Sequence, residues 1–333
     1  MNYFISCDWG TSSLRLKLVD TSTETVLKEI TSDNGTAQTH ESWIRSREQK
    51  SDRLQFYLAV LEEQLETLQL HANTSLDSLP IVISGMASSS IGMLELPYKE
   101  IPFKNDGNDL ETKIIKGTGK FNHDILLISG VRQEDDAMRG EEVQMIGCIN
   151  DDNMDERLFI IPGTHSKHIL VKKGRVVSIK TFMTGEFFNL LSSKSILSGS
   201  IIKPSGFPTE EDLELFRKAV DEGSNSNLLN SSFKIRTREL FGKQRKEENY
   251  AYLSGLLIGT EISELANRRL PITVLGDELQ RKLYGIAFQT LKVLQTEFYD
   301  ADKAIVNGHI RMFILYKQEL GKTANTINQQ PTT

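Results

Sequence analysis

The stretch that decides the fold is YFISCDWGTSSLRLKLVD, from Tyr3 to Asp20. An apolar run leads into the polar segment Asp8 to Ser13, and alternating apolar residues follow from Leu14 to Leu18. Alternation with a period of two, on either side of a short polar segment, indicates two strands joined by a turn. The stretch therefore predicts a β-hairpin at the start of the chain.

The turn of this hairpin is rich in groups that bind phosphate. Gly10 allows another backbone to approach closely, and Thr11 and Ser12 offer hydroxyl and N–H groups. Asp8, at the end of the first strand, can hold Mg²⁺ through its waters, because this cation prefers oxygen ligands and shares them with nucleotide phosphates. The alternative is an ordinary hairpin whose Asp and Ser side chains only stabilise the turn.

The segment Asp8-Trp9-Gly10-Thr11-Ser12, followed by Arg15, resembles the first phosphate motif of the actin/hexokinase/Hsp70 superfamily of sugar kinases and ATPases. The resemblance implies an α/β fold with two actin-like, ribonuclease H-like lobes. Each lobe is expected to open with a β-meander.

Length and composition agree with a two-domain globular protein. The chain has 333 residues, of which 38% are hydrophobic and 25% are charged. A net charge of −6 without a long basic run argues against a nucleic-acid surface. Because no signal peptide and no apolar run of roughly 20 residues is visible, we expect a cytoplasmic protein without a membrane partner. Cys7 and Cys148 lack metal-ligand spacing and are expected to be small buried residues.

The first half of the chain continues as a mixed α/β domain. Thr25 to Ile30 predicts a third antiparallel strand, and apolar spacing of three and four predicts a helix from Arg53 to Leu70. Buried strands are expected at Pro80 to Met86 and around Ile125 to Gly130. The loop from Ser84 to Pro102, rich in small residues, follows a strand end, where α/β sheets usually bind ligands.

A second hairpin repeats the design of the first. Leu158 to Val171 contains an apolar strand, the turn Gly163-Thr164-His165 and another strand, and Val176 to Ile179 extends it to a meander. Internal duplication explains this better than coincidence. Two glycine-hydroxyl turns could grip a triphosphate from either side, and Lys167 or His165 could add positive charge.

The remaining elements are predicted from capping residues and periodicity. Thr184 is expected to cap a helix with Phe187, Phe188, Leu190 and Leu191 in the core. The other expected elements are a helix at 210–223, a less regular connector at 225–241, a helix at 250–267, a strand at 271–276, a helix capped by Asp277 that runs to 295, and a last strand and turn at 304–308 followed by a short helix. The residues from 323 to 333 are expected to form a polar tail.

A larger set of motifs narrows the resemblance. In order, the chain contains Asp8-Trp9-Gly10-Thr11, Ser84-Gly85-Met86, Pro97-Tyr98, Met138-Arg139-Gly140-Glu141-Glu142, Pro162-Gly163-Thr164-His165-Ser166-Lys167, Met183-Thr184-Gly185-Glu186 and Ser254-Gly255-Leu256-Leu257-Ile258-Gly259. This set is similar to the 2-dehydro-3-deoxygalactonokinase family. The resemblance implies ATP-dependent phosphorylation of the C6 hydroxyl of 2-dehydro-3-deoxy-D-galactonate, a step of galactonate breakdown.

The resemblance also implies catalytic roles. Glu141 stands where related sugar kinases carry their base in a Gly-Asp-Gln helix start, although Asp136 or Glu142 could serve instead. Asp8 would orient Mg²⁺. The transferred phosphoryl group would be neutralised by a cation, for which the candidates are Arg15, Arg139 and Lys167.

Binding roles follow in the same way. ATP would lie in a cleft between lobes 1–137 and 138–322, gripped by Gly10, Thr11 and Ser12 and by Gly163, Thr164 and His165. The adenosine side would involve Gly255, Gly259 and Gly276, although glycines four apart in a helix usually serve close packing. The candidates for binding the sugar acid are Gly85, Ser88, Ser89, Tyr98 and Glu186. A homodimer is considered. The alternative functions are a kinase of the same fold for another sugar or sugar acid, or a non-catalytic sugar-sensing or assembling protein with the ATPase fold.

Overall fold

The computed structural model describes residues 2–46, 52–119, 121–149, 155–205, 208–266 and 268–327. The chain divides into two compact units. Unit 1 comprises the described residues up to 149, residues 173–179 and those from 302 onward, and unit 2 comprises residues 155–172 and 180–301. This division differs from the predicted boundary at 137/138, since residues 138–149 and the C-terminal helix belong with the first strands.

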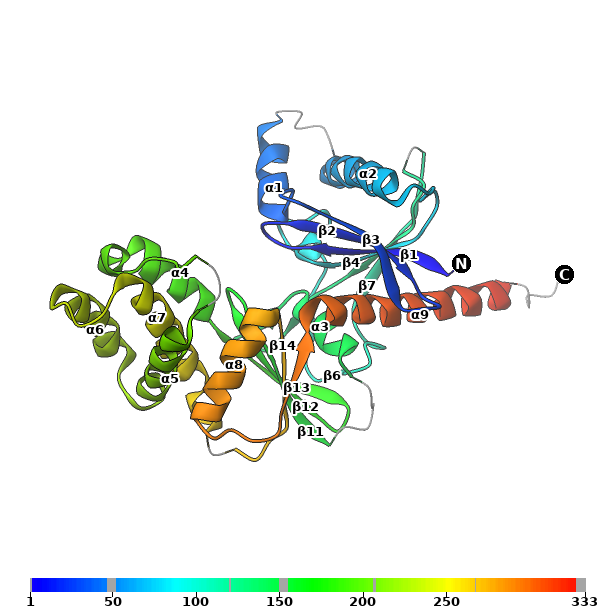
Figure 1. Cartoon of the computed structure of the whole chain (residues 1–333). Coiled ribbons are helices and arrows are strands. Elements are labelled where there is room, and N and C mark those ends of the chain that lie inside the picture. The colour runs from blue at the N-terminus through cyan, green and yellow to red at the C-terminus, as the bar shows by residue number, and fades with distance from the viewer. Residues whose placement is uncertain are drawn as a thin grey trace. The chain divides into compact units, whose positions relative to one another are not determined.

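Unit 1 is built around one large sheet (Figure 1). Its elements are β1 (Tyr3–Trp9), β2 (Leu14–Asp20), β3 (Thr25–Ser32), α1 (Thr36–Arg45), α2 (Arg53–Ala72), β4 (Ile81–Gly85), η1 (Met86–Ser88), β5 (Lys99–Glu100), β6 (Phe103–Lys104), β7 (Thr112–Ile115), β8 (Ile125–Ile128), β9 (Val131–Arg132), β10 (Ala137–Met138), α3 (Glu141–Gly147), β13 (Arg175–Phe182, up to Ile179) and α9 (Ala301–Ile327, from Asp302). The large sheet has the order β3-β2-β1-β4-β8-β7, and β10-β9-β5 form a small second sheet.

Strand β1 lies at the centre of this sheet and has an apolar side chain at nearly every position. Ile5, Cys7 and Trp9 belong to a buried core that includes the apolar face of α2. On the other face, the Phe4 ring stacks on Phe313 of α9 with centroids 4.8 Å apart. Because side chains alternate along a strand, one strand thus serves both layers, and α2 and α9 cover opposite faces of the sheet (Figure 1).

Helix α9 is also held to the sheet by a buried histidine. His309 Nδ1 lies 2.7 Å from Ser6 Oγ, and its Nε2 lies 2.9 Å from Ser84 Oγ. Burial, with a smaller contribution from Lys17, lowers the pKa of His309 to about 3. The imidazole is therefore neutral, and it joins β1, β4 and α9 through hydrogen bonds.

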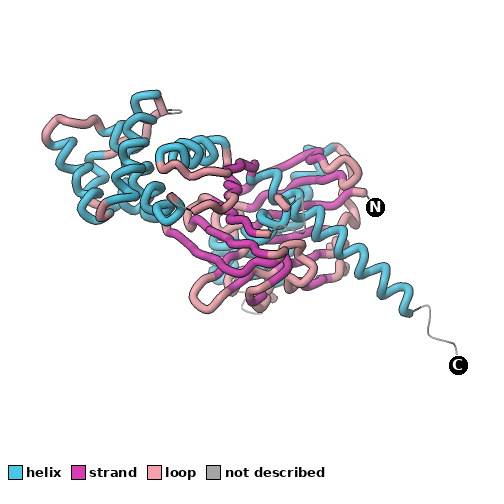
Figure 2. The backbone as a smooth tube through the Cα atoms, turned by 90° about the horizontal axis from the view of Figure 1, so that it is seen from below, coloured by secondary structure: helices cyan, strands magenta, loops and turns pink. Residues whose placement is uncertain are grey.

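The predicted strand and turn at 304–308 is wrong, because this segment lies inside α9, a continuous helix that leads to the C-terminus (Figure 2). Gly308 does not form a turn. A Cβ there would lie 2.1 Å from the carbonyl oxygen of Val143, so the glycine lets α9 pack closely on α3. Part of the predicted tail, up to Ile327, belongs to the same helix, and residues 328–333 lie outside the described part of the chain.

Unit 2 repeats the strand arrangement of unit 1 and adds a group of helices. Its elements are β11 (Glu156–Ile161), β12 (Ser166–Lys172), α4 (Thr184–Lys194), η2 (Ile196–Ser200), α5 (Glu210–Asn225), α6 (Leu228–Leu240), α7 (Lys246–Ile262), η3 (Ser263–Leu265), β14 (Ile272–Gly276), α8 (Glu278–Thr290) and β15 (Thr296–Asp300). The β11–β12 hairpin is antiparallel, and β14 and β15 follow in parallel on the other side of β11. In unit 1, β2-β1-β4-β8 has the same pattern. The predicted α/β fold class, with a hairpin opening each half, is confirmed.

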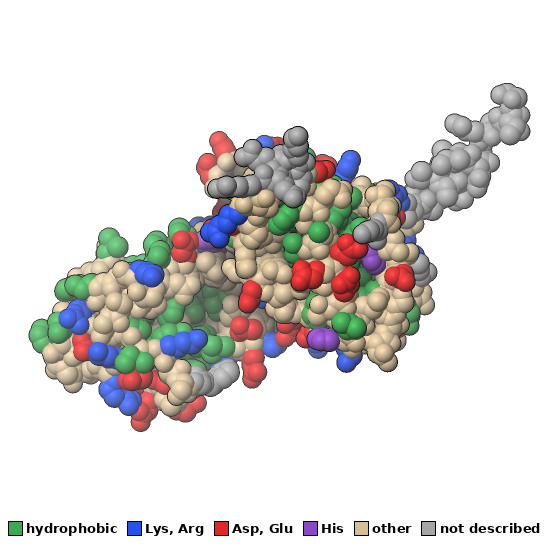
Figure 3. All heavy atoms as spheres, turned by 90° about the horizontal axis from the view of Figure 1, so that it is seen from above, with side chains coloured by type: hydrophobic (Ala, Val, Ile, Leu, Met, Phe, Trp, Pro, Cys, Tyr) green, Lys and Arg blue, Asp and Glu red, His purple; other side chains and the backbone are tan. Residues whose placement is uncertain are grey.

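The helices of unit 2 correct three further predictions. The segment 225–241 is not a connector, because Asn227 caps α6 by accepting a hydrogen bond from the N–H of Asn230. Thr184 is the first residue of α4 and not its cap. Phe187 and Leu190 were expected in the core but are each 45% exposed. Leu229 and Phe233 of α6 are exposed as well. Figure 3 shows hydrophobic side chains on the surface of the helical part of unit 2.

Both cysteines are buried and unpaired, as predicted. Among the helices in the described ranges, none has the length and apolar character needed to cross a membrane.

Candidate active site

The first phosphate turn connects β1 to β2, and hydrogen bonds to the start of α1 hold it in place. The carbonyl oxygens of Gly10 and Thr11 accept hydrogen bonds from the N–H groups of Thr36 and Ala37, at 3.0 and 3.1 Å. These bonds satisfy two N–H groups that a helix N-terminus leaves without partners. Thr11 and Ser12 are exposed, so their hydroxyl and N–H groups remain accessible to an anion.

Asp8 stands at the end of β1, opposite Arg15 in the register with β2. Asp8 Oδ2 lies 3.4 Å from a guanidinium nitrogen of Arg15, and the two side chains are 24% and 47% exposed. Burial raises the pKa of Asp8, and the charges of Arg15 and Lys17 oppose this effect. Such a long contact leaves lone pairs of the carboxylate unused.

Asp8 fits a hydrated Mg²⁺ better than a metal held by protein ligands alone. Nowhere in the described ranges do three or more His, Cys, Asp or Glu side chains gather in a way that could hold a metal ion. A Mg²⁺ ion at Asp8 would draw its remaining ligands from water and from phosphate oxygens, which is the usual pattern for this ion.

Two glycines bring the ends of β1 and β4 and the start of α3 together. Gly85 and Gly140 have φ of 86° and 109°, a region that residues with a side chain rarely adopt. A Cβ at Gly85 would lie 2.8 Å from Trp9 O and 3.4 Å from Asp8 Oδ1. A Cβ at Gly140 would lie 3.4 Å from Gly85 Cα. Asp8, Gly85 and the start of α3, where Glu141 lies, are therefore close together in unit 1.

Arg139 forms a second part of this site. One guanidinium nitrogen donates to the carbonyl oxygen and to the hydroxyl oxygen of Ser88, at 2.7 and 2.6 Å. The guanidinium lies 4.1 Å from the centroid of the Tyr98 ring. Its Nε is buried and has no hydrogen-bond partner within the described residues. The structure thus brings Ser88, Tyr98 and Arg139 together, while Ser89 is buried and donates to Met86 O at 2.7 Å.

The candidate carboxylates at and near the start of α3 have different surroundings. Glu142 is fully buried, and both of its carboxylate oxygens accept a bond from Gly140 N, at 2.9 and 2.8 Å. Burial, reinforced by the charge of Glu141, raises the pKa of Glu142 to about 8. Glu141 is only partly buried, and its Oε2 accepts from Arg139 N at 2.9 Å. Asp136 accepts from the N–H of Ala137. Of the two glutamates, Glu141 is the one that a ligand can reach.

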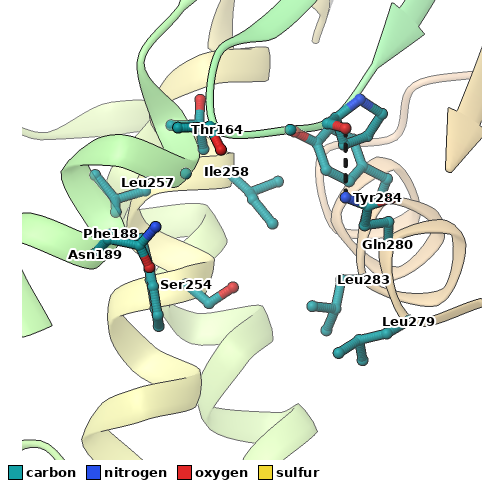
Figure 4. A pocket seen from close by; sticks show the side chains of 14 residues that line it. Thr164, Phe188, Asn189, Ser254, Leu257, Ile258, Leu279, Gln280, Leu283 and Tyr284 are labelled. Atoms are coloured by element: carbon teal, nitrogen blue, oxygen red, sulfur yellow. Dashed lines mark hydrogen bonds between the residues drawn. The ribbon is translucent and has the colours of Figure 1, made fainter. Parts of the chain in front are cut away.

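Unit 2 contains a pocket of about 430 Å³ (Figure 4). Its polar end is formed by the second phosphate turn and by the N-terminus of α4, and its apolar walls come from α7 and α8. The residues that line it are Pro162, Gly163, Thr164, Thr184, Gly185, Phe188, Asn189, Ser254, Leu257, Ile258, Leu279, Gln280, Leu283 and Tyr284. This volume and this mixture of apolar walls with a few polar groups are typical of small-molecule sites.

The polar end of the pocket is built by close contact between the turn and α4. A Cβ at Gly185 would lie 2.5 Å from Gly163 O, so glycine is required for this approach. Thr164 O accepts from Glu186 N at 2.9 Å, and His165 Nε2 lies 2.5 Å from Glu186 Oε2. No side chain caps α4, so the N–H groups of its first two residues, Thr184 and Gly185, offer a place for an anion beside the turn.

Other predicted residues lie away from this pocket. Lys167 is 7% exposed, and its ammonium donates to Thr181 Oγ1 at 2.9 Å. Gly255 and Gly259 serve the packing of α7 on α5, because a Cβ at either would lie within 2.4 Å of a carbonyl oxygen of α5. Glu186, expected at the sugar acid, lies beside His165 in unit 2, whereas Arg139 belongs to unit 1.

The α8 wall includes residues that the sequence reasoning missed. Asp277 caps α8 as predicted, and its capping box with Gln280 folds the glutamine side chain back toward the turn. Gln280 Nε2 donates to Pro162 O at 3.3 Å (Figure 4). Gly276 leaves room for this side chain, since a Cβ there would lie 2.9 Å from Gln280 Cβ. The capping-box spacing was the signal that could have identified Gln280.

Comparison with known proteins identifies the family to which the chain is similar. The model of the 2-keto-3-deoxy-galactonokinase family matches residues 8–312. A protein of Rhizobium meliloti (strain 1021), named a probable 2-dehydro-3-deoxygalactonokinase, is 29% identical over 321 residues, which cover 92% of this chain and 95% of the relative. The 2-dehydro-3-deoxygalactonokinase of Escherichia coli (strain K12) is 29% identical over 226 residues, covering 65% and 72% of the two chains.

A solved structure extends the likeness to three dimensions. A crystal structure of a Sinorhizobium meliloti protein, assigned by its title to the 2-dehydro-3-deoxygalactonokinases, has a TM-score of 0.75 and 27% identity and covers 99% of each chain. The family match includes the turn after β1, the start of α3 and all the residues that line the pocket of unit 2. The chain belongs to the 2-keto-3-deoxy-galactonokinase family.

Proposed function

We propose that this protein transfers the γ-phosphoryl group of ATP to the C6 hydroxyl of 2-dehydro-3-deoxy-D-galactonate, giving 2-dehydro-3-deoxy-6-phospho-D-galactonate in galactonate catabolism. The observation that carries the proposal is the family match over residues 8–312. The chemistry of the two units supports it, since each contains a glycine-hydroxyl turn suited to phosphate.

The nucleotide is assigned to unit 2. The pocket of about 430 Å³ combines apolar side chains from α7 and α8, suited to a base and ribose, with polar groups at one end. At that end, the turn at Gly163 and Thr164 lies beside the N-terminus of α4, where N–H groups and the helix dipole favour phosphate. ATP is therefore the proposed phosphoryl donor.

The acceptor and the base are assigned to unit 1. Glu141 accepts the proton of the C6 hydroxyl, the hydroxyl oxygen attacks the γ-phosphorus, and ADP leaves with the bonding electrons. A positioned base of this kind typically contributes about 10²–10⁴-fold to the rate. Arg139, beside Tyr98 and Ser88, is suited to the substrate carboxylate, because a guanidinium binds a carboxylate through a fixed pair of donors.

Asp8 is the proposed protein ligand for Mg²⁺, which would neutralise charge on the phosphates when bound. Arg15, next to Asp8, and the exposed N–H groups of Thr11 and Ser12 would contact phosphate oxygens. The proposed location is the cytoplasm, since ATP is the proposed donor. The proposed assembly is a homodimer.

The test is the release of ADP in a coupled assay with ATP and Mg²⁺. The acceptors are 2-dehydro-3-deoxy-D-galactonate, its gluconate epimer and a blank without sugar acid. Expected is turnover of the galactonate compound well above the blank, with phosphorus NMR locating the phosphate on C6. No turnover with the galactonate compound, in a folded protein that binds ADP, would contradict the substrate assignment while leaving the nucleotide assignment intact.

A further inference from the structure

A buried carboxylate lies behind the pocket of unit 2. Glu261, near the end of α7, is 3% exposed. Its Oε1 accepts hydrogen bonds from Ser166 Oγ at 2.7 Å and from His168 Nε2 at 2.9 Å. Its Oε2 accepts from Thr184 Oγ1 at 2.5 Å and from the Tyr284 hydroxyl at 2.8 Å. The four lone-pair positions of the carboxylate are therefore all used.

These four donors come from the elements that form the pocket. Ser166 opens β12 directly after the second phosphate turn, Thr184 opens α4, and Tyr284 belongs to α8. Thr184 and Tyr284 themselves line the pocket, and Figure 4 places Tyr284 beside Gln280 at the end near Thr164. One carboxylate on α7 thus fixes the turn, the α4 N-terminus and the α8 wall relative to one another.

The energetics favour a role in positioning. Burying a carboxylate is costly, and well-packed apolar side chains of similar volume are often as stable. Burial by itself would raise the pKa of Glu261, but the hydrogen bonds from His168, Thr184 and Ser166 outweigh it and hold the pKa below its usual value. A fully satisfied polar network specifies one arrangement of its members, which apolar packing does less sharply.

We propose that Glu261 is a positioning residue for nucleotide binding, which holds the second phosphate turn, the N-terminus of α4 and the α8 wall in the arrangement that ATP and ADP require. The inference rests on the proposed function, because it assigns the nucleotide to this pocket. Glu261 acts through its four partners and does not itself line the pocket.

Two pairs of variants test this proposal while keeping the carboxylate in place. Tyr284→Phe removes one donor to Glu261, and its control Tyr252→Phe removes a similar bond from a buried tyrosine to Glu222 on α5, outside the pocket. Ser166→Ala removes a donor that does not line the pocket. Its control, Ser200→Ala, removes a bond from a fully buried serine to Glu239.

The measurements are the Kd for ADP by calorimetry, the KM for ATP, the KM for the sugar acid and kcat. Tyr284→Phe is expected to raise the Kd for ADP and the KM for ATP about tenfold, and Ser166→Ala by a smaller factor in the same direction. In Ser166→Ala, kcat at saturating ATP and the KM for the sugar acid stay within about twofold of wild type, because Ser166 does not line the pocket and the proposed acceptor site and base lie in unit 1. Both controls keep wild-type values.

Wild-type nucleotide binding in Tyr284→Phe and Ser166→Ala, with a loss of thermal stability no different from that of the controls, would reduce Glu261 to a purely structural residue and overturn the proposal. An equal loss of binding in Tyr252→Phe would overturn it too. If the wild-type protein binds no ADP, the nucleotide assignment fails first and the inference falls with it. The wild-type titration distinguishes these cases.

Discussion

Replacing Gly185 by alanine probes the contact between the second phosphate turn and α4 most sharply. The new Cβ would lie 2.5 Å from Gly163 O, 2.9 Å from Thr164 Cα and 3.0 Å from Gly163 C. All three atoms belong to the backbone, so no side chain can rotate away to relieve the overlap. The N-terminus of α4 and the turn must move apart, and the bond from Glu186 N to Thr164 O, now 2.9 Å, must lengthen.

The size of the effect follows from this overlap. Forcing one methyl group into a packed site costs about 1–3 kcal/mol. If the strain is relieved by opening the polar end of the pocket, the loss appears in nucleotide binding as about a 5- to 150-fold rise in the Kd for ADP. The KM for the sugar acid is expected to stay unchanged, because Ser88, Tyr98 and Arg139, which are proposed to bind it, belong to unit 1.

The assay is calorimetric titration of ADP into the folded variant, with Gly199→Ala as the matched control. Gly199 lies in the same unit, and a Cβ there meets no atom within 4 Å. The control is expected to bind ADP as the wild type does. Wild-type affinity in Gly185→Ala would refute the assignment of phosphate to this turn, and an equal loss in Gly199→Ala would show that the effect is not local.

Two further predictions concern unit 1. The native pKa of Glu142, raised to about 8 from an ordinary value of 4.5, means that the folded state favours the protonated form. The stability that the protonated Glu142 contributes is complete below about pH 4.5 and is lost as the pH rises to about 8. In Glu142→Gln, Tm should therefore fall less between pH 5 and 8 than in the wild type. An equal fall of Tm in the two proteins would contradict this prediction. Arg139→Lys should raise the KM for the sugar acid about tenfold, because lysine cannot keep both the Ser88 bonds and the stacking on Tyr98. Arg132→Lys, at an ion pair with the exposed Glu100, is the control and should have wild-type kinetics; equal values in both variants would remove Arg139 from the site.

The hairpins and caps could be predicted from sequence because their signals are local. Alternating apolar residues around Gly10 and Gly163, and the spacing from Asp277 to Gln280, determine structure within a few residues. Helix α9 could not be predicted in this way. Its segment at 304–308 has the local pattern of a strand and turn, but in the structure Gly308 packs on Val143 of α3 and the neighbouring His309 bonds to Ser6 of β1.

At the site, too, the residues that could not be predicted from sequence are those whose role depends on contacts with distant parts of the chain. Lys167 follows a turn that resembles a phosphate-binding turn. Because side chains alternate between the two faces of the strand, its ammonium points to Thr181 instead. Two glycines four residues apart, such as Gly255 and Gly259, fit either a nucleotide site or close packing between helices. In the structure the backbone of α5 packs against both glycines, so they serve helix packing. Glu261 has no local signal, because its four partners come from three separate elements.

The measurement that tests the central claim most directly compares wild type with Glu141→Gln. ADP release is followed with 2-dehydro-3-deoxy-D-galactonate at saturating ATP and Mg²⁺, after circular dichroism and ADP titration have shown that the variant is folded and binds nucleotide. The account predicts a fall in kcat of about 10²–10⁴-fold with KM for both substrates near wild type, because the glutamine keeps the shape of the side chain but cannot accept the proton. Turnover in the variant within a few-fold of wild type would contradict the role of Glu141 and move the base to Asp136, since Glu142 is fully buried.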